Sequence, residues 1–353
     1  MGMILATVTK TFAGLYQFVK AILRLLLLPC NAAWNKPDPR YSFDESMTLK
    51  LTSWILDTFP TATLRWFVDS QSEHSTFQYA RVFLMLLISS CWYRPVDHVN
   101  LESGVQGRWY RRGGQIQELS TDDGVVVLYI HGGGFVCGTS AGESATFFNP
   151  LLGALSTRGI ATRIFSIDYA LAPDNTYPTP VCEVLSAYTW LTEKVQPKRL
   201  VVMGDSAGAN LVLTLLLGLP DDKTPACAVM ISPWVDLHCH DLPSATPYDY
   251  MTKDLFVTWR NMYVGHDLTK VEEASPGLHR LEGLPPLMVV YGECELLANA
   301  IRTFVRKARD NVDVEEVTHP FLFHGYPVVL EDGGGSIDII ADYVVRRVGV
   351  PEQ

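Results

Sequence analysis

Two glycine-rich motifs, each preceded by a short apolar run, constrain the fold of this chain more than any other feature. Residues 131–135 read His-Gly-Gly-Gly-Phe and follow the run 125–130, whereas residues 204–208 read Gly-Asp-Ser-Ala-Gly and follow the run 200–203. A short, unbroken apolar run that ends at glycine is typical of a buried strand that leads into a tight turn. The helical run 207–217 begins within the second motif, so we expect a sharp turn from strand to helix there.

Beyond about residue 97 the pattern alternates between apolar strands and helices. Such alternation predicts an α/β fold with a mostly parallel central sheet flanked by helices on both faces. Two shorter runs are candidates for an antiparallel hairpin on one edge of the sheet, at 107–110 and 115–119. The expected strands are 125–130, 162–167, 200–203, 226–231, 287–291 and 312–317, and the expected helices are 142–156, 180–195, 207–217, 298–310 and 337–348.

The N-terminal segment, residues 1–35, is apolar apart from a few polar residues. Lys10, Lys20 and Arg24 fall on one narrow stripe of a helix. No uncharged stretch reaches the roughly 20 apolar residues that a membrane span needs. We interpret the segment as an amphipathic membrane anchor, or as a tilted span whose cations reach the interface. The alternative is a helix folded onto the protein itself.

Two further segments complete the organisation of the chain. Residues 36–96 show helical runs without a strand pattern, and we expect a helical cap segment there. Residues 97–353 form the α/β domain, which carries an insertion at about 234–285 where no strand is expected.

Charge and cysteine usage exclude several classes of partner. The net charge is −10 and the chain has no basic run, so a nucleic acid is not expected as a partner. The 7 cysteines show neither Cys-x-x-Cys spacing nor a cluster with histidine, so no metal site is expected.

The second motif fits the pattern Gly-x-Ser-x-Gly, in which a serine on a strained turn exposes its hydroxyl as a nucleophile. Gly204 and Gly208 provide the small residues that such a turn needs two positions on either side of Ser206. An ordinary glycine turn is the alternative, but the strand before it and the helix after it favour a nucleophile.

The triple glycine suggests a complementary role for the first motif. Consecutive glycines let several backbone N–H groups turn toward one point, where they stabilise a developing negative charge. Gly133, Gly134 and Ala207 are the expected donors of such an oxyanion hole. His131 is expected to orient the loop rather than to act as a base.

A serine nucleophile needs a base, and the base needs an acid that orients it. When these follow the serine in the order acid and then histidine, two candidates remain for each role. Glu293 and Glu295 follow the strand 287–291, and His319 and His324 lie beyond both of them.

The chain resembles the hormone-sensitive-lipase-like branch of the α/β-hydrolase fold over about residues 100–350. The resemblance implies that Glu295 is the acid and His324 the base, and it implies a cap formed by the N-terminal segment and the insertion. Glutamate stands at position 295 where the family usually has aspartate. Six motifs in family order carry the resemblance: 131–135, 168–174, 204–208, Ser-Pro-Trp-Val-Asp at 232–236, 292–296 and His-Gly-Tyr at 324–326.

This resemblance implies a serine carboxylic-ester hydrolase that needs no cofactor and forms an acyl-serine intermediate. The apolar anchor and cap predict short-acyl esters of a lipophilic alcohol, as in the membrane-bound arylacetamide deacetylases and steryl acetyl hydrolases that the chain also resembles. They predict a membrane surface as a partner, with the endoplasmic reticulum as the candidate compartment. The alternatives are an acyltransferase or cyclase with the same triad, and a non-catalytic binding module. The sequence leaves the oligomeric state open.

Overall fold

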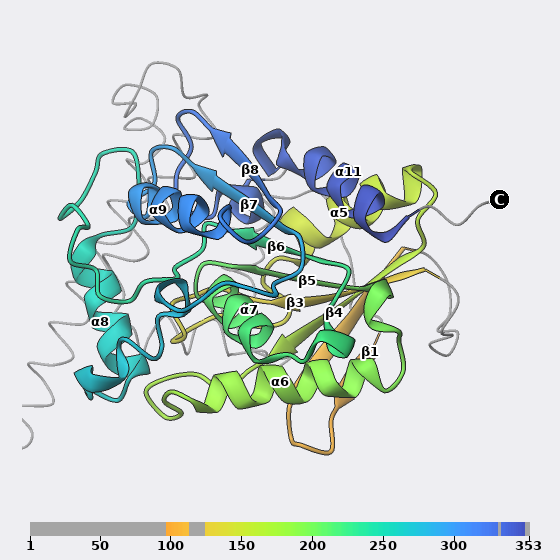
Figure 1. Ribbon diagram of the computed structural model, residues 1–353, viewed down its shortest axis with the longest axis horizontal. Coiled ribbons are helices and arrows are strands. Elements are labelled where there is room, and N and C mark those ends of the chain that lie inside the picture. Colours follow the sequence, from red (N-terminus) through yellow and green to blue (C-terminus); the bar gives the residue numbers. More distant parts are fainter. Residues whose placement is uncertain (1–96, 113–123, 331–332, 350–353) are drawn as a thin grey trace, which may run out of the picture.

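The computed structural model describes residues 97–112, 124–330 and 333–349 of the chain. These residues form an eight-stranded sheet with the strand order β1-β2-β4-β3-β5-β6-β7-β8 (Figure 1). Strands β3 to β8 are parallel, and β2 is antiparallel to both of its neighbours. The strands are Asp97–Asn100 (β1), Gln106–Arg111 (β2), Val125–Ile130 (β3), Thr162–Asp168 (β4), Leu200–Asp205 (β5), Cys227–Ile231 (β6), Leu287–Gly292 (β7) and Val314–His319 (β8).

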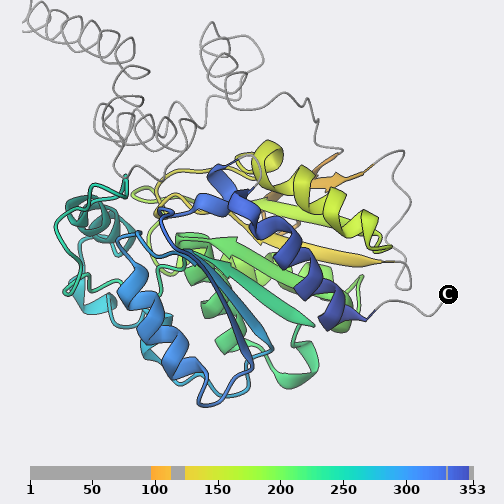
Figure 2. The same ribbon diagram turned by 90° about the horizontal axis from the view of Figure 1, so that it is seen from above.

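Helices cover both faces of this sheet, as Figures 1 and 2 show. Along β3, Val126 and Leu128 join the core that includes α6, α7 and α9, whereas Val127 and Tyr129 join the core that includes α5 and α11. The central strands β3, β5, β6 and β7 are buried along their whole length, which fits the expected parallel α/β architecture. The helices are Asn149–Thr157 (α5), Thr179–Thr192 (α6), Ala207–Gly218 (α7), Lys253–Tyr263 (α8), Ala298–Ala308 (α9), Tyr326–Val329 (α10) and Ser336–Val348 (α11).

The antiparallel edge differs from the expected hairpin. β2 pairs with β1 on one side and with β4 on the other. Both edges of β2 are thus occupied along Gln106–Trp109, and the segment 115–119 lies outside the described residues. β1 carries no apolar run that predicts a strand, since it reads Asp-His-Val-Asn, and as an edge strand it has only Asp97 and Val99 even partly buried.

Two element boundaries also differ, each for a local reason. The helix expected at 142–156 is a π-helical turn, Ser144–Phe148, followed by α5. Pro150 stands in the first turn of α5 and has no N–H to continue the preceding ladder. The last strand begins at Val314 rather than at position 312, because the N–H of Val312 bonds to the carbonyl of Ala308 at 2.8 Å and closes the turn after α9.

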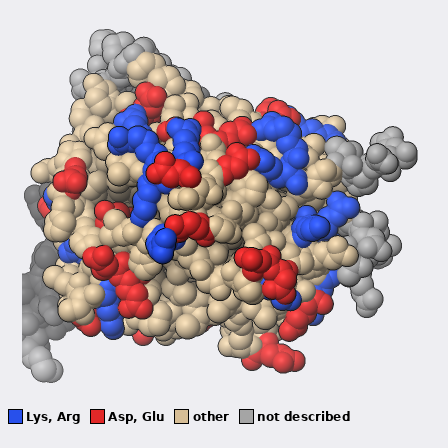
Figure 3. Space-filling view, in the orientation of Figure 1, with Lys and Arg blue, Asp and Glu red and all other residues tan. Residues whose placement is uncertain are grey.

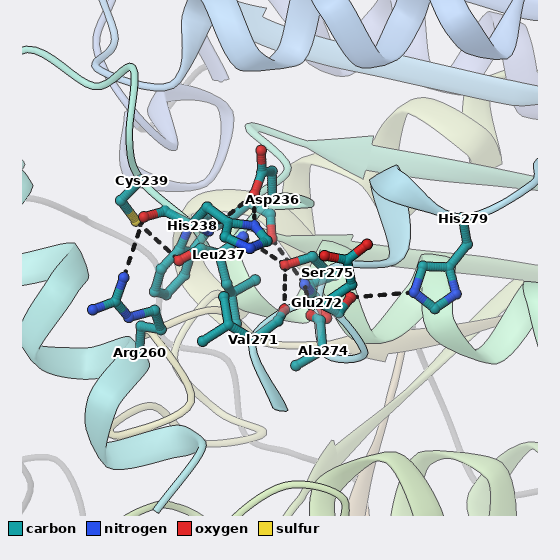
Figure 4. Close-up of polar contacts among 12 residues, drawn as sticks. Asp236, Leu237, His238, Cys239, Arg260, Val271, Glu272, Ala274, Ser275 and His279 are labelled. Carbon is teal, nitrogen blue, oxygen red and sulfur yellow. Dashed lines mark hydrogen bonds and ion pairs between the residues drawn. The ribbon is translucent and has the colours of Figure 1, made fainter. Parts of the chain in front are cut away.

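The chain leaves the sheet after β6 and returns to it at β7, and the intervening residues carry α8. Figure 4 shows how polar contacts hold this insertion together. The hydroxyl of Ser275 donates to the carbonyl of Val271 at 2.6 Å and accepts from the N–H of Leu237 at 2.9 Å. Arg260 on α8 donates to the carbonyl of His238 at 3.2 Å. The Arg260 contact ties α8 to the loop that follows β6, and the Ser275 contacts tie the segment after α8 to the same loop.

The membrane anchor expected at 1–35 and the cap segment expected at 36–96 both lie outside the described residues. Within the described part of the chain, no helix combines the length and the apolar character that crossing a membrane requires. On the face drawn in Figure 3, basic and acidic side chains are interspersed.

Candidate active site

Ser206 lies at the junction between β5 and α7, on a turn that ordinary residues rarely adopt. Its backbone angles are φ 51° and ψ −114°, and its N–H donates to the carbonyl of Ile231 at 2.8 Å. Gly208 packs directly on the backbone of Ile130, and Gly204 packs on Gly208 itself, so a side chain at either position would collide with main-chain atoms. The two glycines are therefore required for the turn, which is strained at its serine.

His324 reaches Ser206 from the loop after β8. Its Nε2 lies 2.9 Å from the Ser206 Oγ, and both side chains are buried. On the other side of the ring, Nδ1 lies 3.5 Å from Oε1 of Glu295, which follows β7. A carboxylate beside Nδ1 favours a proton on that nitrogen and leaves Nε2 able to accept the serine proton. The structure thus brings Ser206, His324 and Glu295 together.

Glu295 is held mainly through its second carboxylate oxygen. Ser232 donates its hydroxyl to Oε2 at 2.6 Å, and the N–H of Gly292 donates to the same oxygen at 3.1 Å. The Ser232 hydroxyl also accepts a hydrogen bond from the N–H of Gly325 at 2.9 Å. Ser232 therefore links the acid to the residue that follows the histidine. The sequence showed this serine only as the first residue of Ser-Pro-Trp-Val-Asp, without indicating a role.

The alternative acid and base occupy other positions. Glu293 is exposed and accepts a hydrogen bond from the Thr318 hydroxyl at 3.1 Å. His319 ends β8, and its ring lies 5.8 Å from that of Tyr326. Among the described residues, neither side chain hydrogen-bonds to Ser206 or to the other members of the site.

The triple-glycine loop follows β3, and the N–H of its first glycine, Gly132, bonds to the residue that precedes the nucleophile. Gly133 and Gly134 adopt φ 93° and 62°, and among the described residues nothing accepts a hydrogen bond from their N–H groups or from that of Ala207 at the start of α7. These are the three groups expected to form an oxyanion hole. His131 stacks on Tyr169 with ring centroids 4.2 Å apart, which fits a role in orienting the loop.

Asp205, the residue before the nucleophile, fastens this loop to the turn. Its Oδ1 accepts hydrogen bonds from the N–H of Gly132 at 2.9 Å and from the hydroxyl of Tyr129 at 2.8 Å. Burial raises the pKa of Asp205 to about 6, and these two hydrogen bonds oppose that rise. The variable position of the Gly-x-Ser-x-Gly pattern thus ties the nucleophile turn to the triple-glycine loop.

Comparison with known proteins identifies the same fold. A family model described as the alpha/beta hydrolase fold matches residues 127–328. The chain belongs to the α/β-hydrolase family.

The relatives of this hydrolase include an acetyl-hydrolase from Streptomyces hygroscopicus, 33% identical over 238 residues that cover 64% of this chain and 77% of the relative. An ethyl acetate hydrolase from Pseudomonas putida is 26% identical over 232 residues, which cover 60% of this chain and 70% of the relative. A solved esterase of the bacterial hormone-sensitive lipase family superposes with a TM-score of 0.62 at 25% identity, covering 94% of this chain and 99% of that one. The expected family resemblance is confirmed, and the chain is a carboxylic-ester hydrolase of the hormone-sensitive-lipase-like branch.

The site of the hydrolase favours a charged imidazole. Burial lowers the pKa of His324, but the hydrogen bond with Glu295 and the charges of Glu295, Asp249 and Asp205 outweigh burial and raise that pKa above its ordinary value of 6.5. Proton transfer from Ser206 to His324 is therefore assisted by the surrounding carboxylates.

Helix α8 places three aromatic residues beside this machinery. Phe256 meets the His324 ring edge-on at 5.8 Å, and Tyr263 stacks on Phe135 with centroids 3.7 Å apart. Trp259 lies so close to Gly134 that its ring would collide with any side chain at that position. One helix of the insertion thus contacts both the histidine and the glycine loop.

No three His, Cys, Asp or Glu side chains within 97–112, 124–330 and 333–349 lie close enough together to hold a metal ion.

Proposed function

We propose that Ser206 is the nucleophile of this hydrolase, His324 its general base and Glu295 the acid that orients the base. The contact between the Ser206 Oγ and the His324 Nε2 at 2.9 Å carries the proposal, since it places the accepting nitrogen on the hydroxyl to be activated. The carboxylate beside Nδ1 supports the same assignment by stabilising the imidazolium that forms.

The reaction then proceeds in two halves. As the Ser206 oxygen attacks the ester carbonyl carbon, His324 takes its proton, and the carbonyl oxygen becomes an anion facing the N–H groups of Gly133, Gly134 and Ala207. The C–O bond to the alcohol breaks, and His324 returns the proton to the leaving alkoxide. Water, deprotonated by His324, attacks the acyl-serine. The second tetrahedral intermediate collapses by breaking its bond to the Ser206 oxygen, His324 returns the proton to that oxygen, and the carboxylic acid is released.

For the substrate, we propose short-acyl esters of a lipophilic alcohol. Trp259, Phe256 and Trp234 are each at most 4% exposed and pack beside the glycine loop and the histidine, so they bound the space around the reacting carbonyl. The printed names of two relatives, an acetyl-hydrolase and an ethyl acetate hydrolase, point to short acyl groups as well.

We also propose that the chain works at a membrane surface, with the endoplasmic reticulum as the candidate compartment. The support is the apolar segment 1–35, whose charges Lys10, Lys20 and Arg24 fall on one helical stripe. Flotation of the full chain with liposomes, compared with a chain that begins after residue 35, tests this proposal. Equal flotation of the two chains would contradict it.

The catalytic roles are tested with Ser206→Ala. We expect kcat for p-nitrophenyl acetate to fall by about 10⁴-fold or more, because the attacking oxygen is removed. Labelling by a fluorophosphonate probe should disappear in the same variant. A variant that retains more than a few per cent of wild-type activity would show that another residue is the nucleophile.

A further inference from the structure

Asp249 lies in the insertion between β6 and β7 and contacts the two loops that carry the acid and the base. Its side chain is buried. Its Oδ2 accepts a hydrogen bond from the N–H of Leu296 at 2.7 Å, and its Oδ1 accepts from the N–H of Met251 at 3.3 Å and of His324 at 3.4 Å. One carboxylate thus joins the residue after Glu295 to the backbone of the histidine itself.

This connection matters because the direct contact between acid and base is long. The 3.5 Å separation of the Glu295 Oε1 from the His324 Nδ1 exceeds the usual 2.7–3.2 Å of an N–H···O bond, as does the 3.4 Å contact of Asp249 with the His324 N–H, whereas the bond of Asp249 to Leu296 at 2.7 Å is short. The other oxygen of Glu295 is committed to Ser232 and Gly292. The positions of the two loops, rather than the strength of their own contact, therefore set the geometry of the pair.

Asp249 also belongs to the set of titratable groups that face His324. Glu295 approaches from the loop after β7, Asp249 and Tyr250 from the insertion, and Asp205 from the end of β5. Burial raises the pKa of the Tyr250 hydroxyl, so it remains neutral and contributes no charge. The three carboxylates are the charged members of this set.

We propose that Asp249 is a positioning residue that holds the Glu295 and His324 loops together and supplies a second negative charge to the imidazolium formed when Ser206 attacks. This role rests on the catalytic roles proposed above. It predicts two effects of removing the charge. The transition state loses stabilisation, so the plateau of kcat falls. His324 also becomes easier to deprotonate, so the acid limb of the pH profile moves to lower pH.

The test compares the pH dependence of kcat/KM for p-nitrophenyl acetate in the wild-type chain and in Asp249→Asn. We expect kcat to fall about 10-fold with little change in KM, and the acid limb to shift down by about 0.5–1 pH unit. A merely structural role for Asp249 would lower the rate without moving the limb.

Asp236→Asn is the matched control, because Asp236 is a carboxylate of the same insertion that accepts a hydrogen bond from the backbone of His238 at 2.9 Å (Figure 4). The acid limb and the kcat of Asp236→Asn should match those of the wild-type chain. A limb in Asp249→Asn that coincides with the wild-type limb would overturn the proposal, and so would an unchanged kcat.

In Asp249→Asn, the side-chain NH2 group faces a backbone N–H from which the carboxylate accepted a hydrogen bond, and two donors facing each other destabilise the fold. A second pair of variants therefore keeps the test valid if Asp249→Asn does not fold. Asp249→Glu and Asp249→Gln differ in charge but hardly in length, and the acid limb of the glutamine variant must lie below that of the glutamate variant. Equal limbs would overturn the proposal. Fluorophosphonate labelling of Ser206 distinguishes failure of the catalytic roles from failure of the Asp249 proposal. If the wild-type chain is not labelled, the catalytic roles are contradicted. If the chains are labelled but their acid limbs are equal, only the role of Asp249 is contradicted.

Discussion

At the scale of single residues, the site depends on small hydroxyl groups as much as on its three reactive side chains. Ser232 donates to Glu295 at 2.6 Å and accepts from the N–H of Gly325 at 2.9 Å. Removing this buried hydroxyl leaves the N–H of Gly325 without its partner and leaves Oε2 of Glu295 with the N–H of Gly292 alone, which costs about 1–3 kcal/mol. Because one partner is the acid and the other is adjacent to His324, that cost falls on the catalytic geometry.

We therefore expect Ser232→Ala to lower kcat for p-nitrophenyl acetate by about 10-fold, with little change in KM, and to lower the melting temperature by several degrees. Steady-state kinetics and thermal unfolding measure the two effects.

Ser275→Ala provides the control, since Ser275 is equally buried and also makes two hydrogen bonds, to Leu237 and Val271, away from the triad. It should lose similar stability but keep the wild-type kcat. Equal losses of kcat in the two variants would show that Ser232 acts only through stability.

At the scale of elements, α8 connects the insertion to the reactive groups. Phe256, Trp259 and Tyr263 stand at spacings of three and four residues, so they share one face of the helix. That face meets the ring of His324, the backbone of Gly134 and the ring of Phe135. The helix thus limits the space beside the oxyanion loop.

A smaller side chain on this face should change acyl selectivity. For Trp259→Leu we expect the ratio of kcat/KM for p-nitrophenyl octanoate to that for p-nitrophenyl acetate to rise about 10-fold, because the indole no longer bounds the acyl side. Removing part of a large buried ring also costs stability, of the order of 2–4 kcal/mol. Rates across a series of acyl lengths measure the ratio.

Trp190→Leu on α6 is the control for this loss of packing. Trp190 packs on Phe165 with ring centroids 5.2 Å apart, far along the chain from α8. In Trp190→Leu the ratio of kcat/KM for the octanoate ester to that for the acetate ester should stay at the wild-type value. A wild-type ratio in Trp259→Leu would contradict the proposal that Trp259 bounds the space around the reacting carbonyl.

The elements that sequence alone could place are those that follow from local pattern. Ser206, Glu295 and His324 each stand after an expected strand, and parallel strands bring their ends to one edge of the sheet. Ser232 and Asp249 could not be placed in the same way, because their contacts to Gly325 and His324 span 93 and 75 residues and depend on how three loops meet. The break before α5 shows that a single proline overrides the apolar pattern around it.

At the scale of the whole molecule, two buried carboxyl groups make stability depend on pH. Burial raises the pKa of Asp205 and that of Asp249 to about 6, from an ordinary value of 3.8. Since the folded state binds these protons more tightly than the unfolded state, their contribution to stability is complete below about pH 4. It is lost as the pH rises through about 6, and amounts to at most about 3 kcal/mol for each group.

Asp249→Asn should therefore flatten the pH dependence of thermal stability. We expect the fall in melting temperature between pH 4.5 and pH 8 to be smaller in this variant than in the wild-type chain, because the amide does not ionise. Thermal unfolding followed by circular dichroism measures both slopes, with Asp236→Asn as the control that should keep the wild-type slope. Identical slopes for Asp249→Asn and the wild-type chain would contradict the account of a carboxyl group that is costly to ionise in the fold.

The central claim is that Ser206 carries the acyl group during turnover, and trapping that intermediate tests it most directly. The wild-type chain would be mixed with p-nitrophenyl acetate, quenched in acid within the burst of p-nitrophenol release, digested and analysed by mass spectrometry. The account predicts a gain of one acetyl group on the peptide that contains Ser206, and none on that peptide in Ser206→Ala. An acetyl group on a different residue, or a burst that persists in Ser206→Ala, would contradict it.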